Sequence, residues 1–270
     1  MGALISYPDR TLAANLSGGA WQPTAPLSNL KDDILSHVAR TTNALANSSI
    51  ILIDLGSVLE IRVASLCKHN ISLTGTVRVR GYSDNSYTDI MATVDTGVIS
   101  AWPDGLTAQN VADYPHNWTY AFATPAAARY WKVEIIDTTN PAGYLELGRC
   151  WLGEAAFEPE VGISNGSSLG YESRDVIVES LGGAIYGDKR IPRRVQVATF
   201  SFLSPVEKRK ALIMQKVLTT TDEAFWIENT DSIAEDMLLE SFPCYFRKAS
   251  PLTYPYLNNN EMPIEVVEKV

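Results

Sequence analysis

The sequence predicts a mostly β protein, with an N-terminal β-sandwich jelly roll over residues 1–155 and a small C-terminal α+β domain over 156–270. Three observations support this prediction. From about residue 50, short runs rich in β-branched and aromatic residues alternate with turn clusters, and helical periodicity is almost absent. After Gly153, Pro, Gly and Ser become frequent, as in a connection between domains. One main helix signal then follows a strand in the second half.

The strands of the first domain are recognised by their short length and their period of two. In GTVRVRGY, valines alternate with arginines, which is typical of an antiparallel strand with one buried face. ARYWKVEIID alternates in the same way, with Trp131, Val133 and Ile135 opposing Tyr130, Lys132 and Glu134. The predicted strands are residues 50–56, 60–66, 75–82, MATVDTG (91–97), 119–124, 128–137 and 144–155.

The second domain contains a helix that begins at Pro205. Ser204 and Glu207 form a capping box, and proline is favoured at the first helical position. Apolar residues then recur at spacings of three and four, giving one apolar face: Ala211, Met214, Val217 and Leu218. A Gly182-Gly183 turn joins two strands before this helix, and AFWIENT, PCYFRKA and MPIEVVEKV supply strands after it.

Composition limits the classes of function. The net charge of -9 and pI near 4.9 argue against nucleic-acid binding, which depends on Lys and Arg neutralising phosphates. We expect no signal peptide and no membrane span, and synthesis in a cytoplasm, because no apolar run approaches about 20 residues. The three cysteines, Cys67, Cys150 and Cys244, lie far apart in apolar segments and are expected to be buried thiols.

The turn after the second strand carries His69-Asn70, the first place to look for chemistry. Catalysis or metal binding would need partners, yet only His37 and His116 remain, neither at a metal-ligand spacing, and there is no CxxC. The sequence also lacks GxSxG and phosphate-binding glycine frames. We therefore expect a structural turn capped by the Asn70 side chain, no catalytic residue, no cofactor and no enzyme activity.

Carbohydrate binding is the more plausible activity, because sugar C–H groups stack on aromatic rings while polar side chains take up the hydroxyls. Long loops between the strands supply such rings. The alternative is that some rings, Trp102 before Pro103 especially, pack as lids over the ends of the sandwich. The candidate carbohydrate-binding residues are Trp21, Tyr82, Tyr87, Trp102, Tyr114 and Trp118.

Two further patterns leave alternatives open. Asn29, Asp32, Asp33 and residues 41–43 offer oxygen ligands suited to a structural calcium ion, without a fixed loop spacing. Arg193-Arg194 and the cluster at 208–210 are the basic clusters of an otherwise acidic chain. They are expected either to pair with acidic faces of neighbouring subunits or to form solvated flanks.

Residues 10–155 resemble the discoidin-like, galactose-binding-like jelly rolls. The segments that carry the resemblance occur in order: IILIDLG, HNIS, TVRVRGYSD, ARYWKVEIID and GYLELGRCWLG. The combination of this half with ESLGGAIYGDKRIPRRVQVATFSFLSPVEKRKALIMQ resembles minor tail or distal tail proteins of long-tailed bacteriophages. In distal tail proteins the ring-forming part commonly precedes the sugar-binding-like domain, so the order here departs from that arrangement.

The resemblance implies a structural protein of the tail tip, located in the virion. The C-terminal module would assemble with other phage tail proteins, as a homo-oligomeric ring, and the jelly roll would be displayed outward toward host-surface glycans. It also implies that a galactose-binding-like jelly roll can carry a structural calcium ion. The alternative function is a free carbohydrate-binding lectin, or an accessory module of a glycan-degrading enzyme, which the loop aromatics favour.

Overall fold

The computed structural model describes residues 2–248, 251–256 and 259–270, which divide into two compact units. The sandwich unit comprises residues 6–155 and 230–241. The α+β unit comprises the segment up to Ile5 together with residues 156–229 and 242–270. The chain therefore changes unit near residue 155, as in the predicted domains 1–155 and 156–270. It also changes unit at three other places, which the sequence did not indicate.

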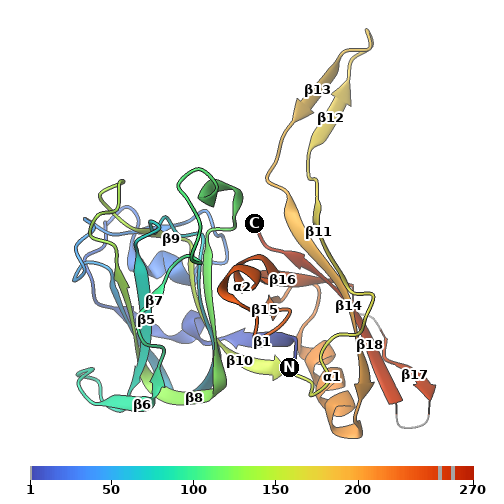
Figure 1. The fold of residues 1–270 in the computed structure, drawn as a ribbon, viewed down its shortest axis with the longest axis horizontal. Helices are drawn as coiled ribbons and strands as arrows, with labels where there is room; N and C mark the ends of the chain where they lie inside the picture. Colours follow the sequence, from blue (N-terminus) through green and yellow to red (C-terminus); the bar gives the residue numbers. More distant parts are fainter. Residues whose placement is uncertain (1, 249–250, 257–258) are drawn as a thin grey trace. The chain divides into compact units, whose positions relative to one another are not determined.

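The sandwich unit is built from antiparallel strands that form two layers of one continuously hydrogen-bonded sheet (Figure 1). One layer has the order β2-β4-β8-β5, with β6 and β7 both pairing with β5; the other has the order β10-β4-β8. The strands are β1 (Leu4–Asp9), β2 (Asn15–Ser17), β3 (Ala39–Arg40), β4 (Ile50–Cys67), β5 (Thr76–Tyr82), β6 (Ile90–Asp95), β7 (Ile99–Ser100), β8 (Asn117–Ile136), β9 (Glu146–Leu147) and β10 (Arg149–Phe157). The short helices are η1 (Arg10–Ala13), η2 (Leu27–Lys31), η3 (Val111–Asp113) and α2 (Ala234–Glu240).

Strands β4 and β8 each pass through both layers. The first part of β4 pairs with residues 130–134 of β8, and its last part, from Val63, pairs with residues 117–121. The register shifts between Asp54 and Leu59 and again between Ile61 and Val63, and Gly56 has φ +78°. Bulges of this kind let one strand bend from one layer of a sandwich into the other. The sequence predicted two separate strands in each of these regions, because a bulge interrupts the period of two.

The predicted alternation fixes which side chains enter the sandwich. Trp131, Val133 and Ile135 of β8 are fully buried, as are Val77 and Val79 of β5. They pack with apolar side chains from the other layer into one core. The residues between them face outward, as the period of two predicts. This core includes Ile51, Ile53, Ala64, Leu66, Trp118, Phe122, Cys150 and Leu152.

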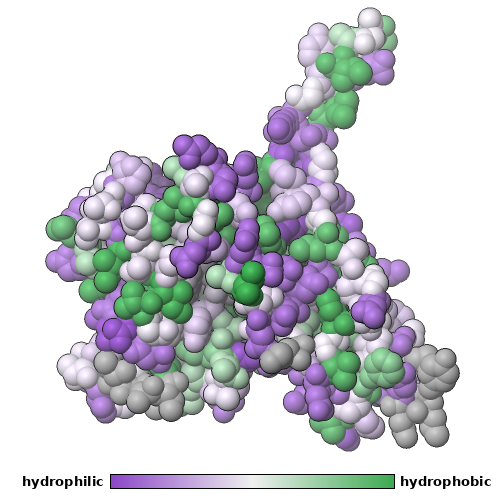
Figure 2. Space-filling view, in the orientation of Figure 1, coloured by the Kyte–Doolittle hydropathy of each residue, from purple (hydrophilic) through white to green (hydrophobic). Residues whose placement is uncertain are grey.

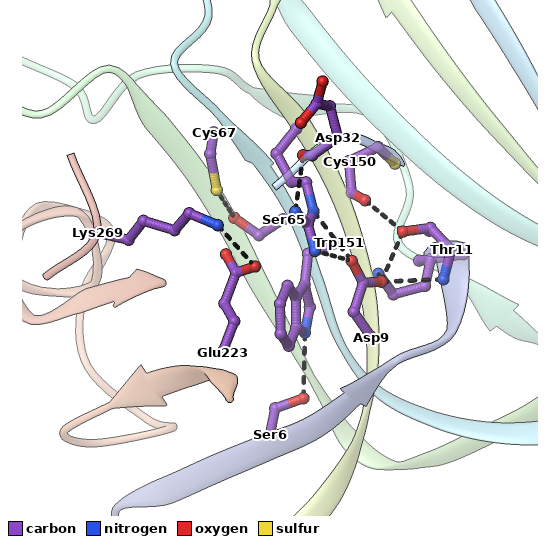
Figure 3. A network of polar contacts seen from close by, with 12 residues as sticks. Ser6, Asp9, Thr11, Asp32, Ser65, Cys67, Cys150, Trp151, Glu223 and Lys269 are labelled. Atoms are coloured by element: carbon purple, nitrogen blue, oxygen red, sulfur yellow. Dashed lines mark hydrogen bonds and ion pairs between the residues drawn. The ribbon is translucent and has the colours of Figure 1, made fainter. Parts of the chain in front are cut away.

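A buried ion pair lies near the start of the sandwich unit (Figure 3). The Arg149 guanidinium donates to Asp9 Oδ2 from Nε (3.1 Å) and Nη2 (2.9 Å), and both side chains are almost completely inaccessible to water. Thr11 donates to Asp9 Oδ1 from its backbone N–H and its hydroxyl. Burial raises the pKa of Asp9, and the charge of Arg149 opposes that shift. This network ties β1 and η1 to β10.

The α+β unit contains a sheet in the order β11-β14-β18-β16-β15, with β17 on β18. In its core the Phe157 ring meets the Phe200 ring edge-on, and the Phe200 ring lies tilted against Trp226, with centroids 5.1 and 6.1 Å apart. The elements are β11 (Ser168–Glu172), β12 (Val176–Glu179), β13 (Ile185–Asp188), β14 (Arg193–Leu203), α1 (Pro205–Val217), β15 (Glu223–Ile227), β16 (Ser241–Lys248), β17 (Thr253–Tyr256) and β18 (Asn259–Glu268). Phe157 and β11 fall in the stretch predicted as an interdomain connection, which is therefore largely part of this unit.

Helix α1 begins as the sequence predicts. The Ser204 side chain accepts from the Glu207 backbone N–H, the Glu207 carboxylate accepts from the Ser204 backbone N–H, and Pro205 is the first helical residue. Ala211, Met214 and Leu218 are buried. Val217, assigned to the same apolar face, is instead 46% exposed.

The basic clusters have partners within this unit. Arg194 is 1% exposed and pairs with Glu268, and its guanidinium lies over the Phe242 ring. Arg193 pairs with Glu172, and Lys208 lies over the ring of Tyr254. Arg194 is thus buried and paired inside its own chain, which corrects the solvated flank expected for it. Pairing of the basic clusters with neighbouring subunits stays a prediction.

Strands β12 and β13 form a two-stranded hairpin that extends away from the rest of the α+β unit (Figure 1). Its turn includes Gly182 and Gly183, and Gly183 has φ +77°, as the predicted Gly-Gly turn requires. We call residues 176–188 the arm. Among the described residues, no helix is long and apolar enough to cross a membrane.

Candidate functional site

The His69-Asn70 turn packs into the loop-rich end of the sandwich. His69 is 2% exposed, and its ring meets the Trp102 ring edge-on at 5.2 Å between centroids. Its Nδ1 accepts the Ile71 backbone N–H, so the histidine side chain caps the turn. Desolvation lowers the pKa of His69 to about 3, which keeps the imidazole neutral. A neutral histidine enclosed by aromatic rings serves packing in this structure.

Asn70 does not cap its own turn, in contrast to the sequence prediction. Its Nδ2 donates to the Tyr144 carbonyl, and its Oδ1 accepts from the Glu146 backbone N–H. The Asn140 side chain donates to the Asn70 carbonyl. Asn70 therefore fastens two loops that are about 75 residues apart in the sequence, an arrangement with no signal in the local pattern.

Three of the six predicted carbohydrate-binding residues are buried. Tyr82, Trp102 and Trp118 are 1%, 3% and 5% exposed. The Trp102 indole donates to the Ile71 carbonyl, and Trp102 and Trp118 line a cavity of about 60 Å³ beside Leu238 of α2. This space holds a few water molecules and is too small to enclose a monosaccharide. These two tryptophans thus occupy positions like the lids considered for Trp102.

The other three predicted residues are half-buried and lie in different environments. Trp21 donates from its indole N–H to the Gly18 carbonyl, and Tyr114 donates from its hydroxyl to Glu235 of α2 at 2.8 Å. Tyr87 lies in the loop between β5 and β6, with φ +57°. Its ring meets those of Tyr82 and Tyr130 edge-on, at 5.5 and 6.0 Å between centroids. The six residues do not converge on one site.

Tyr87 belongs to a polar aromatic surface on the outer face of the sandwich. We call Asp54, Tyr87, Arg129 and Tyr130 the Tyr87 surface. Asp54 of β4 and Tyr82 of β5 are both register partners of Tyr130, so these side chains lie in one row across three strands. Arg129 donates from Nε and Nη2 to the two Asp54 carboxylate oxygens at 2.7 and 3.0 Å.

Charge and burial prepare this surface for hydrogen bonding. The Arg129 hydrogen bond is the main cause that lowers the pKa of Asp54, so the carboxylate is ionised at neutral pH. Burial, with the Asp54 charge next in size, raises the pKa of Tyr87 to about 12, so its hydroxyl keeps its proton. The Arg129 guanidinium also lies 4.8 Å from the centre of the Tyr130 ring. The surface thus combines ring faces, an acceptor carboxylate and guanidinium donors.

Sequence reasoning missed Arg129 and Asp54, and assigned Tyr130 only to the outward face of its strand. The sequence signal that could have identified Tyr130 as a surface aromatic was its position beside Trp131, on the opposite face of the predicted strand. Nothing local indicates that Asp54 lies beside it, because pairing between β4 and β8 brings together residues 75 apart.

A second polar aromatic surface lies where β3 meets β9. Arg40 is the register partner of Glu146 and pairs with its carboxylate, and the Arg40 guanidinium lies 4.4 Å from the centre of the Tyr144 ring. It has one tyrosine where the Tyr87 surface has two. This Tyr144 surface provides a matched comparison for experiments.

The proposed calcium ligands are engaged in other contacts. Asp32 accepts from the Ile34 backbone N–H and contacts His37 Nδ1 at 2.7 Å, and Asn29 donates to the Val38 carbonyl. The Thr41 hydroxyl donates to the Asn43 carbonyl and accepts from the Leu145 N–H. Across the described residues, no group of three or more His, Cys, Asp or Glu side chains is arranged to hold a metal ion. Calcium binding stays a prediction.

Comparison with known proteins gives similarity to solved structures alone. No protein-family model matches the sequence, and no curated protein matches it. The chain is similar to SpGH29 (16% identity, 55% of this chain and 28% of that one, TM-score 0.39). It is also similar to the family 32 CBM of NanJ from C. perfringens in complex with galactose (14% identity, 56% of this chain and 99% of that one, TM-score 0.39). A third similar structure is a fucose binding module from Streptococcus pneumoniae (16% identity, 54% of this chain and 94% of that one, TM-score 0.39). Because the identities and TM-scores are low, the fold assignment rests on the strand pairing described above.

Proposed function

We propose that the sandwich unit binds neutral carbohydrate at the Tyr87 surface. The observation that carries the proposal is the register pair of Asp54 and Tyr130, with the Tyr87 ring edge-on to Tyr130 and the Arg129–Asp54 ion pair beside them. A pyranose can place its C–H groups over a tyrosine ring while its hydroxyls donate to Asp54 and accept from Arg129. Because the ion pair balances its own charge, the surface suits an uncharged sugar.

Binding to a glycan array tests this proposal. Tyr130→Ala is expected to reduce binding at least roughly tenfold, because it removes a stacking face at the centre of the surface. Tyr144→Ala is the matched control, since it removes a tyrosine stacked on an arginine elsewhere on the same unit. Circular dichroism checks that both variants fold. Binding lost with Tyr144→Ala instead, or no binding to any glycan by the wild type, would refute the assignment.

A second candidate function is a structural subunit of a long-tailed bacteriophage tail tip, with the sandwich unit displayed toward the host. The observation that favours an assembly role is the arm, whose apolar side chains have no cover within the described chain (Figure 2). Association of the purified protein with other tail proteins, seen by negative-stain microscopy, is the expected result. A chain that never associates with tail proteins would argue against this candidate.

A further inference from the structure

The arm is a β-hairpin whose two faces are both exposed. Register places Ile177 and Ile185 on one face and Val178 and Tyr186 on the other. These four side chains are between 58% and 71% exposed, and Leu181 in the turn is fully exposed. A two-stranded hairpin in water is marginally stable unless something covers it. Its composition therefore fits a segment that is buried in an assembly.

The exposed apolar surface is spread over both faces of the arm and its turn. A partner on one face covers only part of it, so the contact is smaller than the roughly 800 Å² per partner of a standard stable interface and should depend on concentration. Glu179 and Asp188 are the only charged residues between positions 176 and 188. Asp188 pairs with Arg190 at 3.2 Å, so Glu179 is the remaining acid of an otherwise apolar surface, and a binding partner should be apolar with a positive charge near Glu179.

The same chain carries such a surface on helix α1. Val206, Ile213 and Val217 are 55%, 64% and 46% exposed. Spacings of seven and eleven residues place them on one side of the helix, which we call the α1 strip. Lysines and an arginine outnumber the single acid of this helix: Lys208, Arg209, Lys210 and Lys216 against Glu207.

The geometry points to an occupant for the arm: we propose that the arm of one copy lies along the α1 strip of a second copy. The dimensions agree, since a strand of four residues spans about 13 Å and the strip spans about 16 Å. Glu179 is opposite in charge to the basic residues of the helix, and both surfaces expose apolar side chains that the other can cover. Leu212, exposed on another side of the same helix, lies outside the strip.

Because the arm and the strip are different surfaces, this contact is heterologous. Such contacts repeat from copy to copy, and they close into a ring or continue as a filament. The inference rests on the second candidate function, an assembly role, and deepens it by naming a second copy of this chain as the partner. It is independent of carbohydrate binding at the Tyr87 surface.

Light scattering of the full chain across a range of concentrations tests self-association. The double variant Ile177→Thr/Ile185→Thr keeps β-forming side chains and removes apolar surface from one face of the arm. Ile213→Gln removes apolar surface from the strip and keeps a good helix former. Each is expected to weaken self-association at least roughly tenfold. Leu212→Gln, the matched control, is expected to leave it unchanged.

Crosslinking tests the location of the contact. The native cysteines are all buried, so an introduced cysteine is the exposed thiol of each variant. A Leu181→Cys chain mixed with a differently tagged Ile213→Cys chain is expected to give a heterodimer with a short bis-maleimide. Leu181→Cys mixed with Leu212→Cys is expected to give much less.

Other results would overturn the proposal. A wild-type chain that stays monomeric at all concentrations removes the second copy as partner; if it then associates with other tail proteins, the assembly role survives without self-docking. Oligomers unaffected by both the arm and strip variants place the interface elsewhere. Flotation with phosphatidylcholine vesicles that depends on Ile177 and Ile185, in a monomeric chain, would assign the arm to a lipid surface instead.

Discussion

At the scale of single residues, the Asp9–Arg149 pair is the most consequential buried contact in the sandwich unit. Both side chains are essentially fully buried, so neither charge can be solvated when its partner is lost. Arg149→Met is therefore expected to lower the free energy of unfolding by about 3–5 kcal/mol, measured by urea denaturation.

The Arg78–Asp95 pair provides the control for that measurement. Its side chains are 32% and 21% exposed, and Arg78→Met is expected to cost at most about 1 kcal/mol. In the double variant Asp9→Leu/Arg149→Met no unpaired charge remains, and most of the lost stability should return. A loss with Arg149→Met no larger than that with Arg78→Met would contradict the importance of the buried pair.

His69 makes stability sensitive to acid. Its folded pKa of about 3 lies below the ordinary value of 6.5, so the unfolded chain binds the proton more tightly. The contribution of the neutral His69 side chain to the free energy of unfolding is fully present above about pH 6.5 and is lost as pH falls toward 3. Between pH 7 and pH 5 the wild type is expected to lose about 2 kcal/mol more than His69→Gln, by denaturation at each pH. Equal pH dependence in the wild type and His69→Gln would mean that the imidazole is solvated when it becomes charged.

The His69-Asn70 turn also shows a limit of sequence reasoning. The turn at His69-Asn70 was foreseeable from residue types, whereas the Asn70 bridge to Tyr144 and Glu146 depends on which loops the fold brings together.

At the scale of elements, helix α1 shows where local sequence is sufficient. All interactions of its capping box lie within four residues, so the pattern alone specifies the start of the helix. Ser204→Ala is expected to lower the free energy of unfolding of the α+β unit by about 1 kcal/mol, and Ser204→Gly by less. Thermal denaturation followed by circular dichroism measures both, and equal stability of Ser204→Ala and wild type would contradict a stabilising cap.

Other elements were not accessible from local sequence, for identifiable reasons. β4 and β8 were each predicted as two strands because bulges interrupt the alternation, although their pairing continues on both sides. Helix α2 was missed because it has seven residues and no side-chain cap. In the candidate site, Tyr87 was foreseeable as a loop aromatic. The burial of Tyr82 beside the Tyr87 ring on the outer face, and of Trp118 in the core, depends on tertiary contacts.

At the scale of the whole molecule, the two units differ in where their apolar residues lie. The sandwich unit gathers its large apolar side chains into one core and exposes few. The α+β unit has a core of its own around Phe157, Phe200 and Trp226, yet it also places apolar residues along the arm. If the arm serves assembly, the isolated chain should not depend on it for stability.

Replacing residues 176–188 with two glycines tests this directly. The Arg190 backbone N–H donates to the Asp175 carboxylate at 2.8 Å, so the remaining ends lie close enough for a short turn. The shortened chain is expected to fold, with a thermal midpoint within a few degrees of the wild-type monomer, because the deleted side chains are exposed. Its self-association should be lost, while glycan binding at the Tyr87 surface should remain. A shortened chain that fails to fold would show instead that the arm stabilises its own unit.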